Sequence, residues 1–116
     1  MAIDIQKFFN QQLPSGMAKH PDSAKAIGGT FQLNITGGGG GQWFIDASDS
    51  GPRCQPGKGD HGSADVTVTI ATEDFQKMME DPKNNVMQLF FSGKLKIEGS
   101  QMLLQKFPDL LLLGFS

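Results

Sequence analysis

Hydrophobic and polar residues alternate along four short stretches of the chain, and this alternation predicts β-strands that each bury one face. The stretches are residues 31–36, 41–46, 66–70 and 94–98. A short edge strand is also expected around residues 53–55, inside a segment rich in turn-forming residues. Strands with one apolar and one polar face are typical of an antiparallel or mixed sheet covered by helices on one side, which is an α+β fold.

Apolar residues at helical spacing predict helices before, between and after these strands. The first helix begins near Ile5 and is expected to end at Pro14 and Gly16. Further helices are expected after Thr72 and after Asp81, because each of these side chains can accept a hydrogen bond at a helix N-terminus.

Glycines mark several of the expected helix ends and breaks. Gly93 ends the helix that precedes the last strand, and Gly28 follows a weaker helical pattern that ends at Ile27. Gly99 separates the last strand from a helix that carries Phe107. The chain therefore alternates between short helices and short strands.

One segment of the chain resembles a known family. The sequence FFSGKLKIEG at residues 90–99 is similar to the most recognisable segment of the sterol carrier protein 2 family of small lipid-binding domains. Residues 41–46, 64–70 and 72–75 agree with that family in order and spacing. The resemblance implies a twisted, five-stranded, mostly antiparallel sheet covered on one side by helices, with an apolar cavity between. It also implies that the whole chain of 116 residues is one lipid-binding domain.

Methionine and phenylalanine supply the candidate lipid-binding residues, since the chain has six methionines, nine phenylalanines and no tyrosine. Methionine side chains repack easily around variable ligands. Composition leaves a filled core and a ligand pocket equally open, and the resemblance favours a pocket on which these side chains converge. The predicted lipid-binding residues are Phe75, Met78, Met79, Met87, Phe90, Phe91, Met102, Leu103, Phe107, Leu110 and Leu113.

The C-terminal segment from Leu110 to Phe115 is a separate apolar stretch, because Pro108 detaches it from the preceding helix. Its leucines need an apolar neighbour. We favour the hypothesis that the segment is a lid over the cavity mouth, so that truncation after Phe107 leaves the sheet folded. The alternative is an interface with a second molecule.

Composition and charge exclude several classes of protein. A net charge of −2 without a basic run argues against nucleic-acid binding. The single Cys54 cannot form an internal disulfide and fits a reducing compartment. The chain has no signal-peptide pattern at its start and no apolar run of the ~20 residues that a membrane span needs. A cytoplasmic protein is expected.

Candidate catalytic or metal-binding residues are few. Cys54, Asp60 and His61 lie in a segment of turn-forming residues, but a zinc site usually needs four ligands in close pairs, and the chain has one cysteine and two histidines. The glycine run at 37–41 lacks the lysine and the following helix of a phosphate loop. We therefore expect no metal, no cofactor and no catalysis, and alanine at Asp60 or His61 should leave ligand binding intact.

The predicted function is a non-catalytic intracellular carrier that holds fatty acid, fatty acyl-CoA, sterol or isoprenoid-like ligands in an apolar cavity. The expected partner is an apolar, lipid-like small molecule, with transient contact to membranes and a monomeric or weakly dimeric state. Two alternatives stay open. One is an interaction module that docks through its apolar C-terminal tail, and the less favoured one is a small lipid-modifying enzyme that uses Asp60 or His61.

Overall fold

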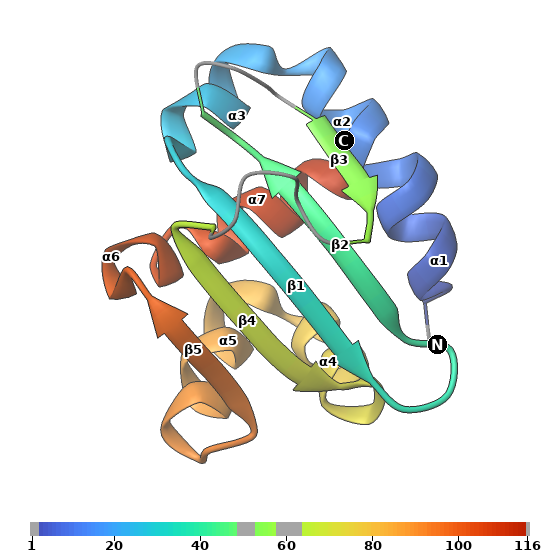
Figure 1. Ribbon diagram of the computed structural model, residues 1–116, viewed down its shortest axis with the longest axis vertical. Coiled ribbons are helices and arrows are strands. Elements are labelled where there is room, and N and C mark those ends of the chain that lie inside the picture. Colours follow the sequence, from blue (N-terminus) through green and yellow to red (C-terminus); the bar gives the residue numbers. More distant parts are fainter. Residues whose placement is uncertain (1–2, 49–52, 58–63, 116) are drawn as a thin grey trace.

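A five-stranded mixed sheet forms the centre of the molecule, as the computed structural model of residues 3–48, 53–57 and 64–115 describes it (Figure 1). The strand order is β3-β2-β1-β4-β5. The β1–β4 pair is parallel, and the other neighbouring pairs are antiparallel. The strands are β1 (Thr30–Thr36), β2 (Gly41–Asp46), β3 (Arg53–Pro56), β4 (Val66–Ala71) and β5 (Leu95–Gly99).

Short helical segments lie behind the sheet in the view of Figure 1, and the sheet face toward the viewer carries none of the labelled helices. This arrangement confirms the predicted α+β class. The helix expected after residue 100 is divided into two short helices. The helical segments are α1 (Ile5–Lys7), the π-helical η1 (Phe8–Gln12), α2 (Leu13–Lys19), α3 (Pro21–Ile27), α4 (Thr72–Glu80), α5 (Pro82–Phe91), α6 (Gln101–Leu104), α7 (Phe107–Leu112) and the 3-10 turn η2 (Leu113–Phe115).

The register of the sheet directs one set of side chains toward the helices. In β1, Phe31, Leu33 and Ile35 are buried, and the residues between them are half-buried. Leu33 lies opposite Trp43 on β2 and opposite Val68 on β4, and both partners are buried as well. Because paired residues share a face, the predicted alternation places one continuous apolar surface under the helices.

The first helix does not end at Pro14 as predicted, because a π-helical turn accommodates the proline. In this turn the N–H of Leu13 donates to the carbonyl of Phe8, and Pro14 has no N–H to donate. The carbonyl of Phe9 accepts instead from the thiol of Cys54 on β3, at an S···O distance of 3.2 Å. The helix therefore continues into α2.

Gly16 was also predicted to end the first helix, and this prediction is wrong because Gly16 lies inside α2. A Cβ atom at Gly16 would overlap the carbonyl oxygen of Leu113 in η2. Gly114, the residue after Leu113, packs so close to the ring of Phe8 that a Cβ atom at this position would overlap the ring. These two glycines let the last turn of the chain press directly against the N-terminal helix.

The C-terminal segment is part of the helical layer. Leu110 and Leu111 have no exposed surface, and Leu113 is 9% exposed. The ring of Phe115 lies 5.4 Å from the ring of Phe8. The lid hypothesis stays a prediction, but this packing leads us to expect that truncation after Phe107 would strip the N-terminal helix of apolar neighbours.

We expect the substitution Gly16→Ala to destabilise the fold. In an exposed helix, alanine is favoured over glycine by about 1 kcal/mol. Here the added methyl group meets a backbone carbonyl that cannot rotate away, so the net loss should be roughly 1–3 kcal/mol. Urea unfolding measures the effect. Ser15→Ala, on the exposed face of the same helix, is the matched control and should be neutral, whereas a Gly16→Ala variant as stable as the wild type would contradict the contact.

The tail leucines offer a second test. Leu111→Ala should lower the free energy of unfolding by about 2–5 kcal/mol, because Leu111 is fully buried. The neighbouring substitution Leu112→Ala should lower the free energy of unfolding clearly less, since Leu112 is half-buried. Thermal and urea unfolding distinguish the two. Small and equal effects would indicate that the tail detaches in solution, as a lid would.

Candidate functional site

Six of the predicted lipid-binding residues lie in the core between sheet and helices. Phe75 and Phe107 have no exposed surface. The ring of Phe75 lies 5.5 Å from that of Phe9, and Phe107 stacks on Phe31 at a centroid distance of 5.6 Å. Aromatic pairs at these distances fill space by direct contact. The six buried residues are Phe75, Met78, Met79, Phe107, Leu110 and Leu113.

The three predicted residues on α5 lie farther out. Val86 and Leu89 occupy the buried face of this helix, whereas Met87 and Phe90 are half-buried and pack against the edge of the core. Phe91 is 77% exposed. The helix thus carries two neighbouring apolar stripes, and the one that packs in the core is the one that was not predicted to bind lipid.

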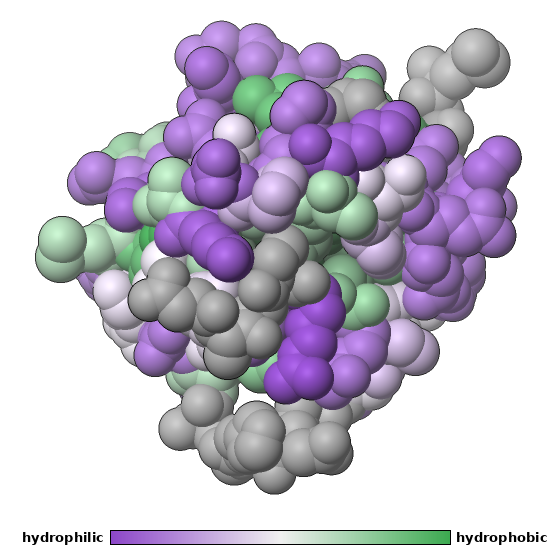
Figure 2. Space-filling model, turned by 90° about the horizontal axis from the view of Figure 1, so that it is seen from above, coloured by the Kyte–Doolittle hydropathy of each residue, from purple (hydrophilic) through white to green (hydrophobic). Residues whose placement is uncertain are grey.

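The last two predicted residues, Met102 and Leu103, line a hollow of about 510 Å³ beside α6. The hollow lies where α3 ends, β4 begins and α6 passes over them. Figure 2 looks onto this end of the molecule from above, and apolar side chains reach the surface at its left margin, the side on which α6 lies in Figure 1. The other lining residues are Ile27, Gly28, Asp65, Ser100, Gln105 and Lys106.

The structure therefore divides the predicted residues among a packed core, the outer stripe of α5 and the hollow at α6. Phe91 and Met102 do not share a space, because the end of α5 and the helix α6 lie at opposite ends of β5 (Figure 1). Their role in binding lipid stays a prediction. The lining residues that sequence reasoning missed are mostly polar or lie where a helix or strand begins or ends. The Gly28-Gly29 pair was the one feature of the sequence that pointed to this place.

Leu103 connects the hollow with the core. Its side chain lines the hollow and also packs against the core cluster. The Leu103 side chain packs directly on the backbone of Gly29, where a Cβ atom would overlap the Leu103 methyl groups. Gly29 itself is held by its carbonyl, which accepts from the N–H of Ala47 at 2.9 Å.

Polar and charged groups stand around the apolar floor of this hollow. The ammonium group of Lys106 donates to the carbonyl of Ala26 at 3.2 Å and stays exposed. Asp65 accepts the N–H of Thr30 at 3.0 Å, and its own N–H donates to the Thr30 hydroxyl at 2.9 Å. Asp65 thereby fixes the start of β4 beside β1, and Lys106 supplies a positive charge at the rim.

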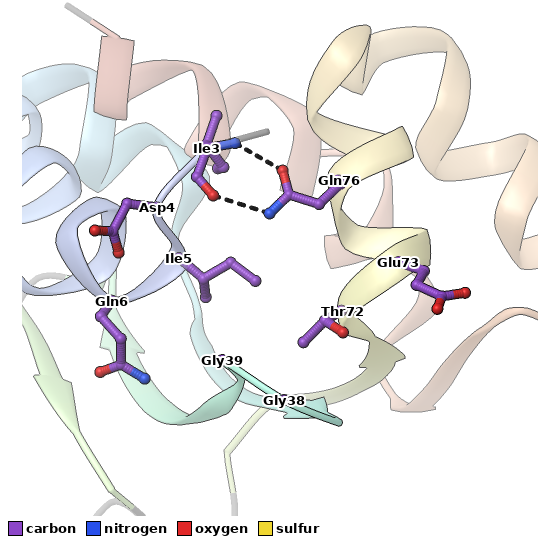
Figure 3. Close-up of a pocket in the computed structure, with 9 residues that line it drawn as sticks. All are labelled: Ile3, Asp4, Ile5, Gln6, Gly38, Gly39, Thr72, Glu73 and Gln76. Carbon is purple, nitrogen blue, oxygen red and sulfur yellow. Dashed lines mark hydrogen bonds between the residues drawn. The ribbon is translucent and has the colours of Figure 1, made fainter. Parts of the chain in front are cut away.

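A second hollow of about 370 Å³ lies between the N-terminal segment, the β1–β2 hairpin and the start of α4 (Figure 3). The amide of Gln76 binds both backbone groups of Ile3, at 2.8 and 2.9 Å. Gln6 donates to the carbonyl of Gly40 at 2.8 Å. These polar groups tie the N-terminal segment to α4 and to the hairpin, so this hollow is more polar than the one at α6.

Cys54 is unsuited to nucleophilic chemistry. Burial raises the pKa of its thiol from 9.0 to about 12, so the thiol stays protonated at neutral pH. Asp46 is buried and accepts the N–H of Ser48 at 2.9 Å, with the Arg53 guanidinium at 3.9 Å, so it orders the end of β2. Asp60 and His61 lie outside the described residues.

The described part of the chain contains no cluster of three side chains suited to hold a metal ion. Within the same residues, none of the helices has the length and apolar character to cross a membrane.

Comparisons with known proteins bear on the family and on the fold. The model of the SCP-2 sterol transfer family matches residues 9–112. Hydroxysteroid dehydrogenase-like protein 2 of Rattus norvegicus is 38% identical over 91 residues, which cover 75% of this chain and 16% of that protein. The chain thus corresponds to a minor part of that relative.

A fatty acid-binding protein of Yarrowia lipolytica is 30% identical over 91 residues, which cover 77% of this chain and 70% of that protein. The solution structure of palmitated SCP2L2 from Aedes aegypti superposes with a TM-score of 0.68 at 25% identity, over 96% of this chain and 95% of that one. The family model and these likenesses extend through the strands, the helices and the hollow, and they agree with the resemblance at residues 90–99. The chain belongs to the SCP-2 sterol transfer family.

Proposed function

We propose that this protein is a non-catalytic carrier of lipid-like molecules, and that the hollow at α6 is where a ligand enters. The observation that carries this proposal is the combination of an apolar floor, a rim that bears Lys106 beside Asp65, and a half-buried leucine that contacts both hollow and core. A volume of about 510 Å³ falls within the range of about 300–1,000 Å³ typical of small-molecule sites.

The proposed mechanism is the transfer of an apolar chain from water to the protein interior. Each methylene group that leaves water contributes about 0.8 kcal/mol. The ligand enters when Leu103 rotates away from Gly29, and the tail then lies between α6 and the core residues behind it. Movement of one side chain is easier than separation of the packed core, because Leu103 is already half-buried rather than enclosed.

The ligand class follows from the rim. Lys106 favours an anionic headgroup, and the Asp65 carboxylate at the same rim is already held by the N–H of Thr30. A fatty acid or a fatty acyl-CoA, whose headgroups carry negative charge, therefore fits better than an uncharged sterol. Two relatives support this choice by their names alone, one called a fatty acid-binding protein and one whose structure is described as palmitated. Sterols and isoprenoid-like molecules are the other candidate ligands, and a role as a protein-docking module is the outcome if no lipid binds.

Filling the hollow should block binding. We expect Leu103→Trp to weaken the affinity for a fluorescent fatty acid about tenfold, the effect of losing roughly two buried methylene groups. Fluorescence titration of delipidated protein measures this, together with native mass spectrometry of wild-type protein for co-purified lipid. Gln88→Trp, on an exposed part of α5, is the control and should bind as the wild type does.

One result would contradict this placement, and another would contradict the function. Unchanged binding by Leu103→Trp combined with a loss in Met87→Ala would move the site to α5. Failure of every tested lipid to bind wild-type protein would reject the carrier function itself.

The charge at the rim can be tested separately. Lys106→Gln should weaken the binding of a fatty acid by up to about fivefold, because an exposed charge contributes about 0.2–1 kcal/mol. Binding of the fatty alcohol of equal chain length should not change, since it has no charge to pair. Lys83→Gln, an exposed lysine on α5, is the matched control. An equal effect of Lys106→Gln on acid and alcohol would show that the ammonium group does not contact the headgroup.

A further inference from the structure

The two edges of the sheet differ in how they are protected. At one edge, β3 is short, ends in Pro56 and lies against η1 and α2. Both features are common devices that prevent an edge strand from pairing with another chain. At the other edge, β5 has no strand on its outer side within the described residues, and Figure 1 shows only the last turn of α5 near its lower end. This strand therefore presents backbone groups that a further strand could bind.

The charges on β5 have an order that suits pairing with a second copy. Lys96 and Glu98 are exposed and lie opposite Thr69 and Thr67 of β4, on the sheet face away from the helices. A two-fold axis through Ile97 places Lys96 opposite Glu98 of the second copy and Glu98 opposite Lys96 of the second copy. Side chains directly opposite each other in antiparallel strands lie about 4.5–5.5 Å apart, so both contacts join opposite charges.

The two most exposed large apolar side chains fit the same axis. Phe91 and Met102 are 77% and 80% exposed, and they lie before and after β5 at nearly equal sequence distances from Ile97. Because the end of α5 and the start of α6 lie at opposite ends of β5, the axis brings the element that carries Phe91 in each copy toward the element that carries Met102 in the other. Sulfur–aromatic contacts are favourable, and exposed apolar groups gathered beside a free edge are a sign of an interface.

Charged residues on an edge strand often prevent it from pairing with another strand. The arrangement of the charges on β5 therefore decides whether two copies of this strand can pair. Two lysines at positions 96 and 98 would repel their copies, whereas one lysine and one glutamate attract them. We propose that two copies of this chain associate through antiparallel β5 strands centred on Ile97, which joins their sheets into one. The contact is small, so the dimer is weak and depends on concentration. This inference does not require the proposed lipid-carrier function.

Charge reversal tests the register. Lys96→Glu places glutamates opposite glutamates, and Glu98→Lys places lysines opposite lysines. Each single variant should weaken dimerisation about tenfold in sedimentation experiments, since two attractive pairs become repulsive. An equimolar mixture of the two variants should form heterodimers, recognised by their mass in native mass spectrometry, because every opposing pair is then complementary. The double variant Lys96→Glu with Glu98→Lys should recover dimerisation.

Lys83→Glu changes the net charge as Lys96→Glu does, but on an exposed position of α5, and it should leave dimerisation unchanged. Phe91→Ser should weaken the dimer as well and reports on the contact even if a β5 variant fails to fold, which circular dichroism detects. A wild-type protein that stays monomeric at every concentration, or a dimer that survives both single charge reversals, would overturn the proposal. So would a dimer that is lost in Phe115→Ser and kept in Lys96→Glu, because its interface would lie at the C-terminal tail.

Discussion

The close contact between α2 and the C-terminal turn is the interaction on which the helical layer depends. The sheet presents a continuous apolar face, and each of the helical segments that cover it is short. Short helices have little stability of their own and gain it from packing. Gly16 and Gly114 allow the first and last parts of the chain to meet at backbone distance, so that Phe8 and the tail leucines are buried together. The C-terminal segment therefore completes the helical layer that the N-terminal helix begins.

Aromatic stacking extends this contact into the sheet. Phe9 stacks on Trp43 at a centroid distance of 4.8 Å, and Phe8 meets Phe9 edge to face at 5.0 Å. The π-helical turn that carries these rings is stabilised by the Cys54 thiol, which supplies the donor that Pro14 cannot. Cys54, which the sequence offers as a candidate reactive group, thus donates a hydrogen bond to a backbone carbonyl.

A lipid carrier must reconcile a stable core with an opening for an apolar ligand. In this structure Phe31, Phe75 and Phe107 are fully buried in the core, and the proposed opening lies at α6, where the side chain of Leu103 packs over Gly29. Dense cores resist change in volume, whereas a half-buried leucine can rotate at little cost.

Much of this architecture is determined by local sequence. Period-two alternation specified the strands, and glycine specified the left-handed helix ends at Gly28 and Gly93, with φ angles of 75° and 79°. The segment at residues 90–99 was sufficient to indicate the family. Tertiary structure decided the rest, because periodicity shows which residues share a helix face and not what that face meets. It therefore separated buried Phe75 from exposed Phe91 and placed Gly16 inside a helix. It also brought Lys106 and Leu103 to one hollow, since a site formed by elements far apart in the chain exists only after they pack.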